Sequence, residues 1–317
     1  MGLLSEYINK GLSILELEKE LRTLIKRYNE IRKSWLFVYA SANGVNGNFI
    51  PDSMVNMDDY YIIHDMLKDC NSKSLDFYIE TPGGSGEAAE EIVRCLRRKF
   101  ENVSFVVSGE AKSAGTIIVL SGDEILMTRS GSLGPIDAQV SIGRTRISAY
   151  DYMEWVDEKR KIAEKTGRLN PFDATMIAQI SPGELNGVMH SLKFAEDLVK
   201  EWLPKYKFKN WNVTESRKIK VTQKMKEERA IEIAADLMNH RKWRSHGRSI
   251  KIEDLENIGL IITKVDDDLE LANIVYKIQT VLRMIFSSSS IYKVYATEKA
   301  KISKQAAPIK SSPAVSP

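Results

Sequence analysis

Residues 75–86 read LDFYIETPGGSG, and residues 103–120 read VSFVVSGEAKSAGTIIVL. Both stretches follow one plan, in which a short apolar strand runs into a turn of small residues and the turn opens a helix. The glycines mark the turns, because a glycine-rich run is disfavoured inside both strands and helices. Strand, helix, strand and helix at this spacing predict an α/β fold with a parallel sheet.

The two turns are expected to face one crevice. Parallel strands bring their carboxyl ends to the same edge of a sheet, and open α/β folds bind their ligands there. In the second turn, Ser113 stands among alanine and glycine at the entrance to a helix, where its hydroxyl is accessible. A nucleophilic serine needs N–H donors that meet the oxyanion formed by its attack on a carbonyl. The candidate donors are Gly83, its neighbour Gly84, and Ala114.

A serine before a helix also has a common structural role. Its side chain caps the helix by accepting a backbone N–H from the first turn. The pattern Ala-x-Ser-x-Gly at residues 111–115 therefore fits a helix cap as well as a nucleophile. The glycine-rich turn at residues 81–86 favours the nucleophile.

Three blocks of the sequence resemble a known family. They are TPGGSGEA at residues 81–88, EAKSAGT at residues 110–116 and SLGPIDAQ at residues 132–139. In this order they resemble the Clp protease and crotonase superfold, and within it the serine dehydrogenase proteinase family, over residues 36–265. The resemblance implies a ClpP/crotonase-like fold of repeated ββα and βα units around a parallel sheet, flanked by extra N- and C-terminal helices. It also implies Ser113 as the nucleophile, with Gly83 and Ala114 as oxyanion-hole donors.

The general base is left open by this resemblance. Clp peptidases place a histidine just after the strand that corresponds to residues 124–127, and the segment SGSLGPIDAQ at residues 130–139 contains none. By resemblance to the carboxyl-terminal block of the family, His246 is the best-placed imidazole, and an imidazole can take up a proton near neutral pH. Asp137 is expected to orient a base or substrate, unless it only shapes a turn.

Lysine is the alternative base. Signal peptide peptidases of the same superfold use a lysine from a downstream helix, and the helix expected at residues 148–168 carries three, Lys159, Lys161 and Lys165. For each of them taken singly, a solvated charged face is the favoured interpretation. Lys112 directly precedes Ser113, although consecutive side chains on a turn usually diverge. The sequence thus leaves both a Ser-His and a Ser-Lys enzyme open.

Composition argues against several other classes of protein. The net charge of +3 on 317 residues gives no case for binding nucleic acid or a membrane surface. The lysine- and aromatic-rich stretch at residues 205–224 could stack single-stranded bases, but a surface insertion or a subunit contact is favoured. Cys70 and Cys95, without a Cys/His cluster, disfavour disulfides and structural zinc. With no Walker motif either, no metal, nucleotide or other cofactor is expected.

The chain is expected to divide into four parts. They are an N-terminal helical arm (residues 1–35), a Clp-fold peptidase domain (36–265), a C-terminal helix (266–297) and a disordered tail (298–317). The N-terminal stretch lacks the apolar core of a signal peptide and no long apolar span follows, which predicts a cytoplasmic protein without membrane contact. The superfold usually forms rings or trimers, which implies a homo-oligomer. Any unfoldase or adaptor would be a separate partner.

These observations predict a serine endopeptidase that hydrolyses a peptide or protein substrate through an acyl-enzyme on Ser113. Two other functions stay open. A crotonase-like enzyme would act on an acyl thioester with the same oxyanion hole but without a serine nucleophile. A catalytically inactive Clp-fold scaffold would use the fold for binding alone.

Overall fold

A seven-stranded sheet forms the centre of the computed structural model, which describes residues 2–42, 44–45, 48–142, 145–214 and 216–307. In spatial order its strands are β11 (Thr263–Lys264), β7 (Glu124–Met127), β5 (Asn102–Val107), β4 (Ser74–Glu80), β1 (Trp35–Ser41), β12 (Ile291–Ala296) and β13 (Lys301–Gln305). The five strands from β11 to β1 run parallel. The last two are antiparallel to their neighbours.

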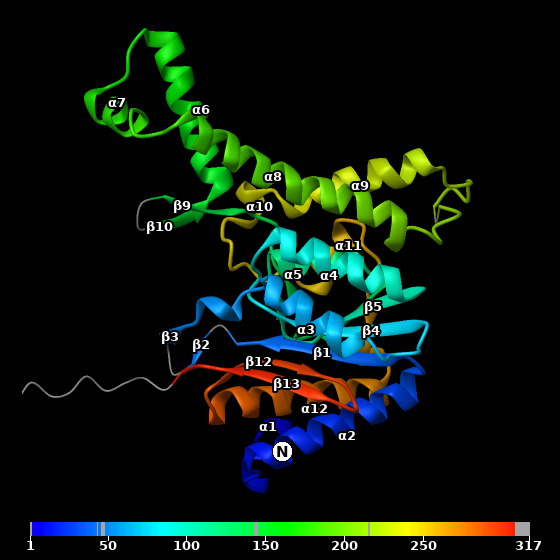
Figure 1. The fold of residues 1–317 in the computed structure, drawn as a ribbon. Coiled ribbons are helices and arrows are strands. Elements are labelled where there is room, and N and C mark those ends of the chain that lie inside the picture. The colour runs from blue at the N-terminus through cyan, green and yellow to red at the C-terminus, as the bar shows by residue number, and fades with distance from the viewer. Residues whose placement is uncertain (1, 43, 46–47, 143–144, 215, 308–317) are drawn as a thin grey trace, which may run out of the picture.

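Helices cover both faces of this sheet (Figure 1). One face carries α3 (Met57–Leu67), α4 (Gly86–Lys99) and α5 (Ala114–Leu120), with α8 (Pro182–Trp202) and α9 (Gln223–Leu237) in a further layer outside them. The other face carries α1 (Leu3–Lys10), α2 (Ile14–Arg32) and α12 (Leu269–Ser288). Strand side chains alternate between the two cores, Phe77 facing the first and Tyr78 the second. Because both faces are buried, the central strands β1, β4 and β5 are rich in apolar residues.

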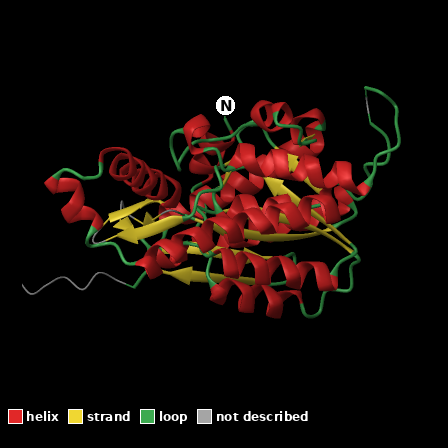
Figure 2. Ribbon diagram, turned by 90° about the horizontal axis from the view of Figure 1, so that it is seen from above, coloured by secondary structure: helices red, strands yellow, loops and turns green. Residues whose placement is uncertain are grey.

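An arm projects from this layered body, as Figures 1 and 2 show. It consists of the hairpin β9 (Gln139–Ile142) and β10 (Thr145–Ser148), the helices α6 (Ala149–Thr166) and α7 (Pro171–Ile177), and the first part of α8. The remaining elements are short: β2 (Gly44–Val45), β3 (Asn48–Phe49), β6 (Glu110–Ala111), β8 (Ser132–Leu133), α10 (His240–Trp243), α11 (Ile252–Asn257), the 3₁₀ turns Pro51–Ser53 and Val265–Asp267, and the π-turn Leu203–Lys207.

The structure confirms the predicted α/β class. The strands expected at residues 75–79 and 103–107 are β4 and β5, they pair in parallel, and each leads through a turn into a helix. The segment 130–139 contains β8, which pairs in parallel with β6 beside the nucleophile turn. A two-residue strand of this kind has no periodic signal of its own, because only its distant partner defines it.

The predicted disordered tail at residues 298–317 is wrong in its first part. Lys301–Gln305 is β13, which pairs with β12, and residues 308–317 lie outside the described part of the chain. The C-terminal unit expected as a helix at residues 266–297 also holds a strand, because β12 pairs with β1. Residues of α2 and α12 share one apolar core with the sheet, so these flanking helices pack on the body. The division into four parts otherwise stays a prediction.

Candidate active site

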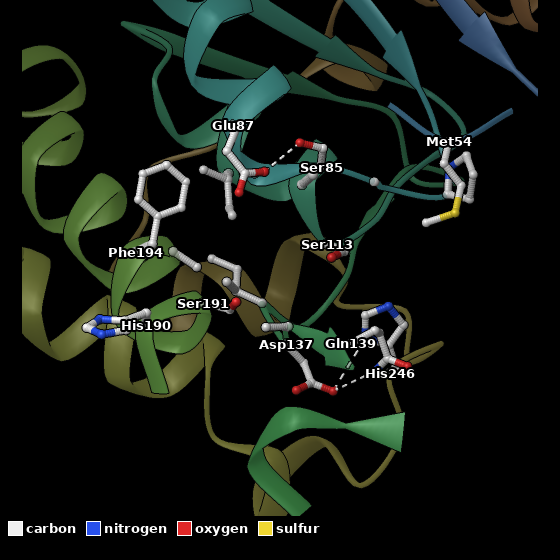
Figure 3. A pocket seen from close by; sticks show the side chains of 18 residues that line it. Met54, Ser85, Glu87, Ser113, Asp137, Gln139, His190, Ser191, Phe194 and His246 are labelled. Carbon is white, nitrogen blue, oxygen red and sulfur yellow. Dashed lines mark hydrogen bonds and ion pairs between the residues drawn. The ribbon is translucent and has the colours of Figure 1, made fainter. Parts of the chain in front are cut away.

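A cavity of about 450 Å³ opens at the point where the two glycine-rich turns meet. Parts of the chain that are far apart in sequence line it (Figure 3). They are the turn after β4, the entrance to α5, the segment around Asp137, the middle of α8 and the loop that carries His246. The predicted convergence of the two turns on one hollow is therefore present in the structure.

Ser113 enters the cavity from a strained backbone turn. Its φ and ψ are 50° and −113°, a region that residues with a side chain rarely adopt. Such a strand-to-helix turn presents a serine hydroxyl outward, as in enzymes with a nucleophile elbow. Ser113 stands at the N-cap position of α5, yet its side chain accepts no N–H from that helix. By contrast, Ser85 caps α4 by accepting the N–H of Ala88 at 3.1 Å. The helix-cap interpretation of Ser113 is thus wrong.

Small residues make this turn possible. A Cβ on Gly115 would lie 2.5 Å from Cγ2 of Thr81, in the neighbouring glycine-rich turn, so only glycine fits there. The hydroxyl of Thr116 then ties the turn together, because it lies 2.9 Å from the carbonyl oxygens of both Ala111 and Gly134. The spacing Ala-x-Ser-x-Gly-Thr therefore reflects close backbone packing around the serine.

The backbone N–H groups beside Ser113 differ in their partners. Gly83 donates its N–H to Oγ1 of Thr81 at 3.3 Å, and it does not line the cavity. Gly84 and Ala114 do line it, and within the described ranges neither amide donates a backbone hydrogen bond. Gly84 has a φ of +155°, and a Cβ there would lie 2.3 Å from the carbonyl oxygen of Val55, so the position requires glycine. Of the predicted donors, Gly84 and Ala114 are free and Gly83 is occupied.

His246 and Asp137 lie together on one side of the cavity that Ser113 also lines (Figure 3). Nδ1 of His246 lies 3.5 Å from Oδ2 of Asp137, somewhat beyond hydrogen-bonding distance. Asp137 is 5% exposed and accepts hydrogen bonds from Nε2 of Gln139 at 3.0 Å and from the hydroxyl of Ser148 at 2.9 Å. Because Nδ1 faces the carboxylate, Nε2 of His246 is the nitrogen left for another partner.

The predicted lysines lie elsewhere in this chain. Lys159 and Lys161 on α6 pair with acidic neighbours, at 3.4 Å from Oδ2 of Asp173 and 2.6 Å from Oδ2 of Asp157. Lys165 is exposed near the end of the same helix. None of the three lines the cavity, and neither does Lys112, whose side chain turns away beneath the loops. The structure brings together Ser113, His246 and Asp137 and leaves these lysines apart.

Helix α8 supplies cavity residues that the sequence did not indicate. His190, Ser191 and Phe194 come from this helix, and Figure 3 shows them on the side of the cavity opposite His246. A Cβ on Gly86 would lie 3.2 Å from the ring of Phe194, so this ring packs directly on the start of α4. The only sequence signal was the amphipathic pattern of α8, which does not say which face meets the nucleophile.

Neither a metal-binding cluster nor a membrane-spanning helix occurs among the described residues. No group of three or more His, Cys, Asp or Glu side chains in these ranges is arranged to hold a metal ion. No helix in them combines the length and apolar character needed to cross a bilayer.

Comparisons with known proteins identify relatives of the chain. MJ0137, an uncharacterized protein of Methanocaldococcus jannaschii, is 27% identical over 207 residues, which are 65% of this chain and 59% of that protein. MJ1495, an uncharacterized protein of the same organism, is 35% identical over 66 residues, which are 21% of this chain and 23% of that protein. The chain thus matches less than two thirds of the length of either relative.

Two solved structures of the membrane-bound stomatin-specific protease 1510-N, both mutants, are also similar. One is 15% identical with a TM-score of 0.38 and covers 70% of this chain and 79% of that chain. The other, in complex with a substrate peptide, is 16% identical with a TM-score of 0.38 and covers 69% and 74%. The sequence model of the ClpP-like SDH-type serine proteinases matches residues 44–201, a range that includes both glycine-rich turns, Ser113 and Asp137. Through this match the chain belongs to the family of ClpP-like SDH-type serine proteinases.

Proposed function

We propose that the protein is a serine endopeptidase of the Ser-His type, which hydrolyses peptide bonds through an acyl-enzyme on Ser113. One observation carries the proposal: the Ser113 hydroxyl stands on a strained turn, caps no helix and shares a cavity with His246 and Asp137. A backbone strained at one residue persists only where the surrounding structure enforces it, and such residues cluster at functional sites.

The proposed reaction has two stages, which are formation of the acyl-enzyme and its hydrolysis. Nε2 of His246 takes the proton of the Ser113 hydroxyl while Oγ attacks the carbonyl carbon of the substrate. When the tetrahedral intermediate collapses, the C–N bond breaks and the imidazolium gives its proton to the leaving amine. Water then attacks the ester on Ser113 by the same route and releases the acid. Asp137 stabilises the imidazolium, as the third member of a triad does.

The N–H groups of Gly84 and Ala114 are the proposed oxyanion donors. Gly84 lies on the turn after β4, and Ala114 lies on the turn that holds Ser113. Among the described residues, neither amide donates to a backbone acceptor. Pre-placed donors of this kind are each worth about 10²- to 10³-fold in kcat in acyl-transfer enzymes. This replaces Gly83 as the donor, because its N–H already contacts Thr81.

The apolar part of the cavity is proposed to hold a substrate side chain beside the cleaved bond. Ile117, Ile136 and Phe194 line this part. Burial of a leucine side chain there in place of alanine should gain about 2 kcal/mol, or roughly 30-fold in kcat/KM. Narrowing the space with Ile117→Trp should reduce this preference below about threefold in competing fluorogenic peptides. An unchanged leucine preference in Ile117→Trp would place the side-chain site elsewhere.

The crotonase-like and scaffold alternatives make different predictions for the same cavity. A thioester enzyme would need the oxyanion donors but no nucleophile, so its turnover would survive in Ser113→Ala. A scaffold would show no covalent chemistry at Ser113. The free hydroxyl on a strained turn favours the peptidase over both, because neither alternative needs this feature.

Covalent labelling tests the proposed nucleophile. Incubation of the native protein with a fluorophosphonate should add one phosphonyl group, which peptide mass spectrometry should locate on Ser113. Ser85→Ala and Ser191→Ala are matched controls, because both serines line the same cavity and both variants should label as the native protein does. An adduct on either of these serines, or native protein that stays unlabelled at millimolar probe, would refute the proposal.

The location, the assembly and the partners of the enzyme are also part of the proposal. We infer a cytoplasmic homo-oligomer that acts on a peptide or protein substrate, with any unfoldase or adaptor as a separate partner. The flanking helices and the projecting arm are the surfaces available for assembly (Figure 1). Size-exclusion chromatography with light scattering measures the subunit number directly.

A further inference from the structure

The side chain of Lys112 is buried next to the nucleophile, and its carboxylate partner, Glu110, is half exposed to solvent. The residue is 6% exposed, and its nearest acidic atom is Oε1 of Glu110 at 3.8 Å. Burial lowers the pKa of Lys112, because water no longer solvates the ammonium. A buried lysine is costly unless neighbouring groups satisfy its N–H bonds. A buried lysine at this position therefore suggests a structural or functional role for its side chain.

Neutral oxygens from two separate segments surround the ammonium. On one side are Oγ of Ser132 at 3.5 Å and the carbonyl oxygen of Leu133 at 3.3 Å. On the other side are the carbonyl oxygen of Arg248 at 3.1 Å and Oγ of Ser249 at 3.0 Å. The second pair lies two and three residues after His246, in the loop that leads to α11. Lys112 therefore bonds the loop that carries the imidazole.

The path of the Lys112 side chain is fixed by its surroundings. A Cβ on Gly134 would lie 2.7 Å from Cδ of Lys112, so the aliphatic stem runs directly against that glycine. The backbone of Lys112 is held as well, since its N–H donates to the carbonyl oxygen of Thr81 at 3.0 Å and its carbonyl accepts from Gly115 at 2.8 Å. The lysine thus spans from the rigid Ser113 turn to the His246 loop.

These contacts do not suit Lys112 as the general base. An ammonium has three N–H donors, and the three shortest contacts already use them. A base would also need Oγ of Ser113 as a partner, and in the described structure Lys112 has no such contact.

His246 needs external support for its position. It lies on an irregular loop between α10 and α11, its Nδ1 has no hydrogen-bond partner among the described residues, and the Asp137 carboxylate oxygen is 3.5 Å away. Further along this loop the backbone of Ile250 pairs with that of Leu133, at 3.0 and 2.9 Å. A misplacement of about 1 Å of a catalytic group can cost about 100-fold in rate.

We propose that Lys112 is a positioning residue, which ties the His246 loop to the nucleophile turn and so sets the imidazole within reach of Ser113. The inference rests on the proposed function, because it assigns His246 as the base. It explains why a lysine directly precedes the serine: the two neighbours point to opposite sides, one into the cavity and one beneath it.

A double-mutant cycle tests this role. The second-order rate constant of fluorophosphonate labelling at Ser113 would be measured for native protein, Lys112→Met, His246→Ala and the double variant. Lys112→Met should label about 30- to 100-fold more slowly. In the His246→Ala background the same substitution should change the rate less than about threefold, because no imidazole remains to be placed. Equal factors in both backgrounds would overturn the proposal, and so would an unchanged rate in Lys112→Met.

A stability control separates positioning from unfolding. Leu282→Ala opens a cavity in the buried core on the far face of the sheet and touches neither loop. It should lower the free energy of unfolding by about 2–5 kcal/mol while the labelling rate at 20 °C stays within about twofold. If Lys112→Met fails to fold, Ser249→Ala decides the question, since it removes one loop-side contact and keeps the lysine. It should slow labelling more than Ser132→Ala, whose contact is on the other side, and the reverse order would overturn the proposal.

Nuclear magnetic resonance gives a readout that does not depend on activity. The chain has four histidines, so the ring signals can be assigned by single substitutions. In Lys112→Met the His246 ring signals should shift or broaden while those of His64 and His190 stay in place. Native protein that does not label at all would refute the proposed function. Unaltered His246 signals in Lys112→Met would refute the positioning role by itself.

Discussion

Replacing Ser113 with alanine should lower kcat for peptide hydrolysis by about 10⁴-fold or more, with KM changed little. The substitution removes the attacking oxygen but leaves the oxyanion donors and the apolar part of the cavity, so binding is retained. The measurement is steady-state hydrolysis of a fluorogenic peptide library by native and variant protein purified in parallel. Residual activity within tenfold of native would mean that another residue or a contaminating protease does the work.

At position 113, a substitution that removes activity should also increase stability. Ser113→Gly should be as inactive as Ser113→Ala but more stable by about 1 kcal/mol, because glycine adopts a positive φ without steric cost. Urea unfolding of the two inactive variants measures this difference. Equal stabilities would show that the turn stores no strain. Such a result would weaken the main observation behind the proposed function, since the serine would then stand in an unstrained conformation.

Replacing Lys293 with methionine should lower the free energy of unfolding by about 3–5 kcal/mol. Lys293 and Asp59 form an ion pair with both side chains 0% exposed, at 2.8 Å between Nζ and Oδ1. The hydroxyls of Tyr39 and Tyr295 also bond this carboxylate. Removal of the lysine leaves a buried carboxylate without its cation, and that charge cannot reach water. Urea unfolding followed by circular dichroism measures the loss.

Lys304 provides the matched control for this prediction. It joins the neighbouring strand β13 to the same helix α3 through Oδ2 of Asp58 at 3.0 Å, but the aspartate side chain is 74% exposed. Lys304→Met should therefore cost less than about 1 kcal/mol. If Lys293→Met lowers the free energy of unfolding as little as Lys304→Met does, the charge of the buried Asp59 carboxylate must be neutralised by another group.

The central βα units could be predicted from sequence because their signals are local. The runs that became β4 and β5 each hold a block of apolar residues, Phe77–Ile79 and Phe105–Val107, and glycines mark the turns that follow. Ser113 was found for the same reason, since small residues must surround a turn as tight as this one. Its backbone strain and free hydroxyl could not be read from the sequence, because an N-cap serine has the same neighbours.

The remaining features depend on long-range contacts. Lys293 falls in the unit predicted as a C-terminal helix, and its burial appears only when the fold pairs it with Asp59. His246 was singled out by its distance from the end of the family block, whereas its contact with Asp137 appears only in three dimensions. The α6 lysines looked equally suitable as bases, until the fold placed that helix in the projecting arm.

The pairing of β12 with β1 has a consequence for biosynthesis. Nζ of Lys293 donates to the carbonyl oxygen of Met54, and the next residue, Val55, bonds the turn that holds Gly84. Every residue that lines the cavity precedes Lys293 in the chain and so leaves the ribosome before it. A growing polypeptide therefore lacks this support of the Gly84 turn until translation has passed residue 293. The turn that holds a proposed oxyanion donor would thus gain this support only after every residue that lines the cavity has been synthesised.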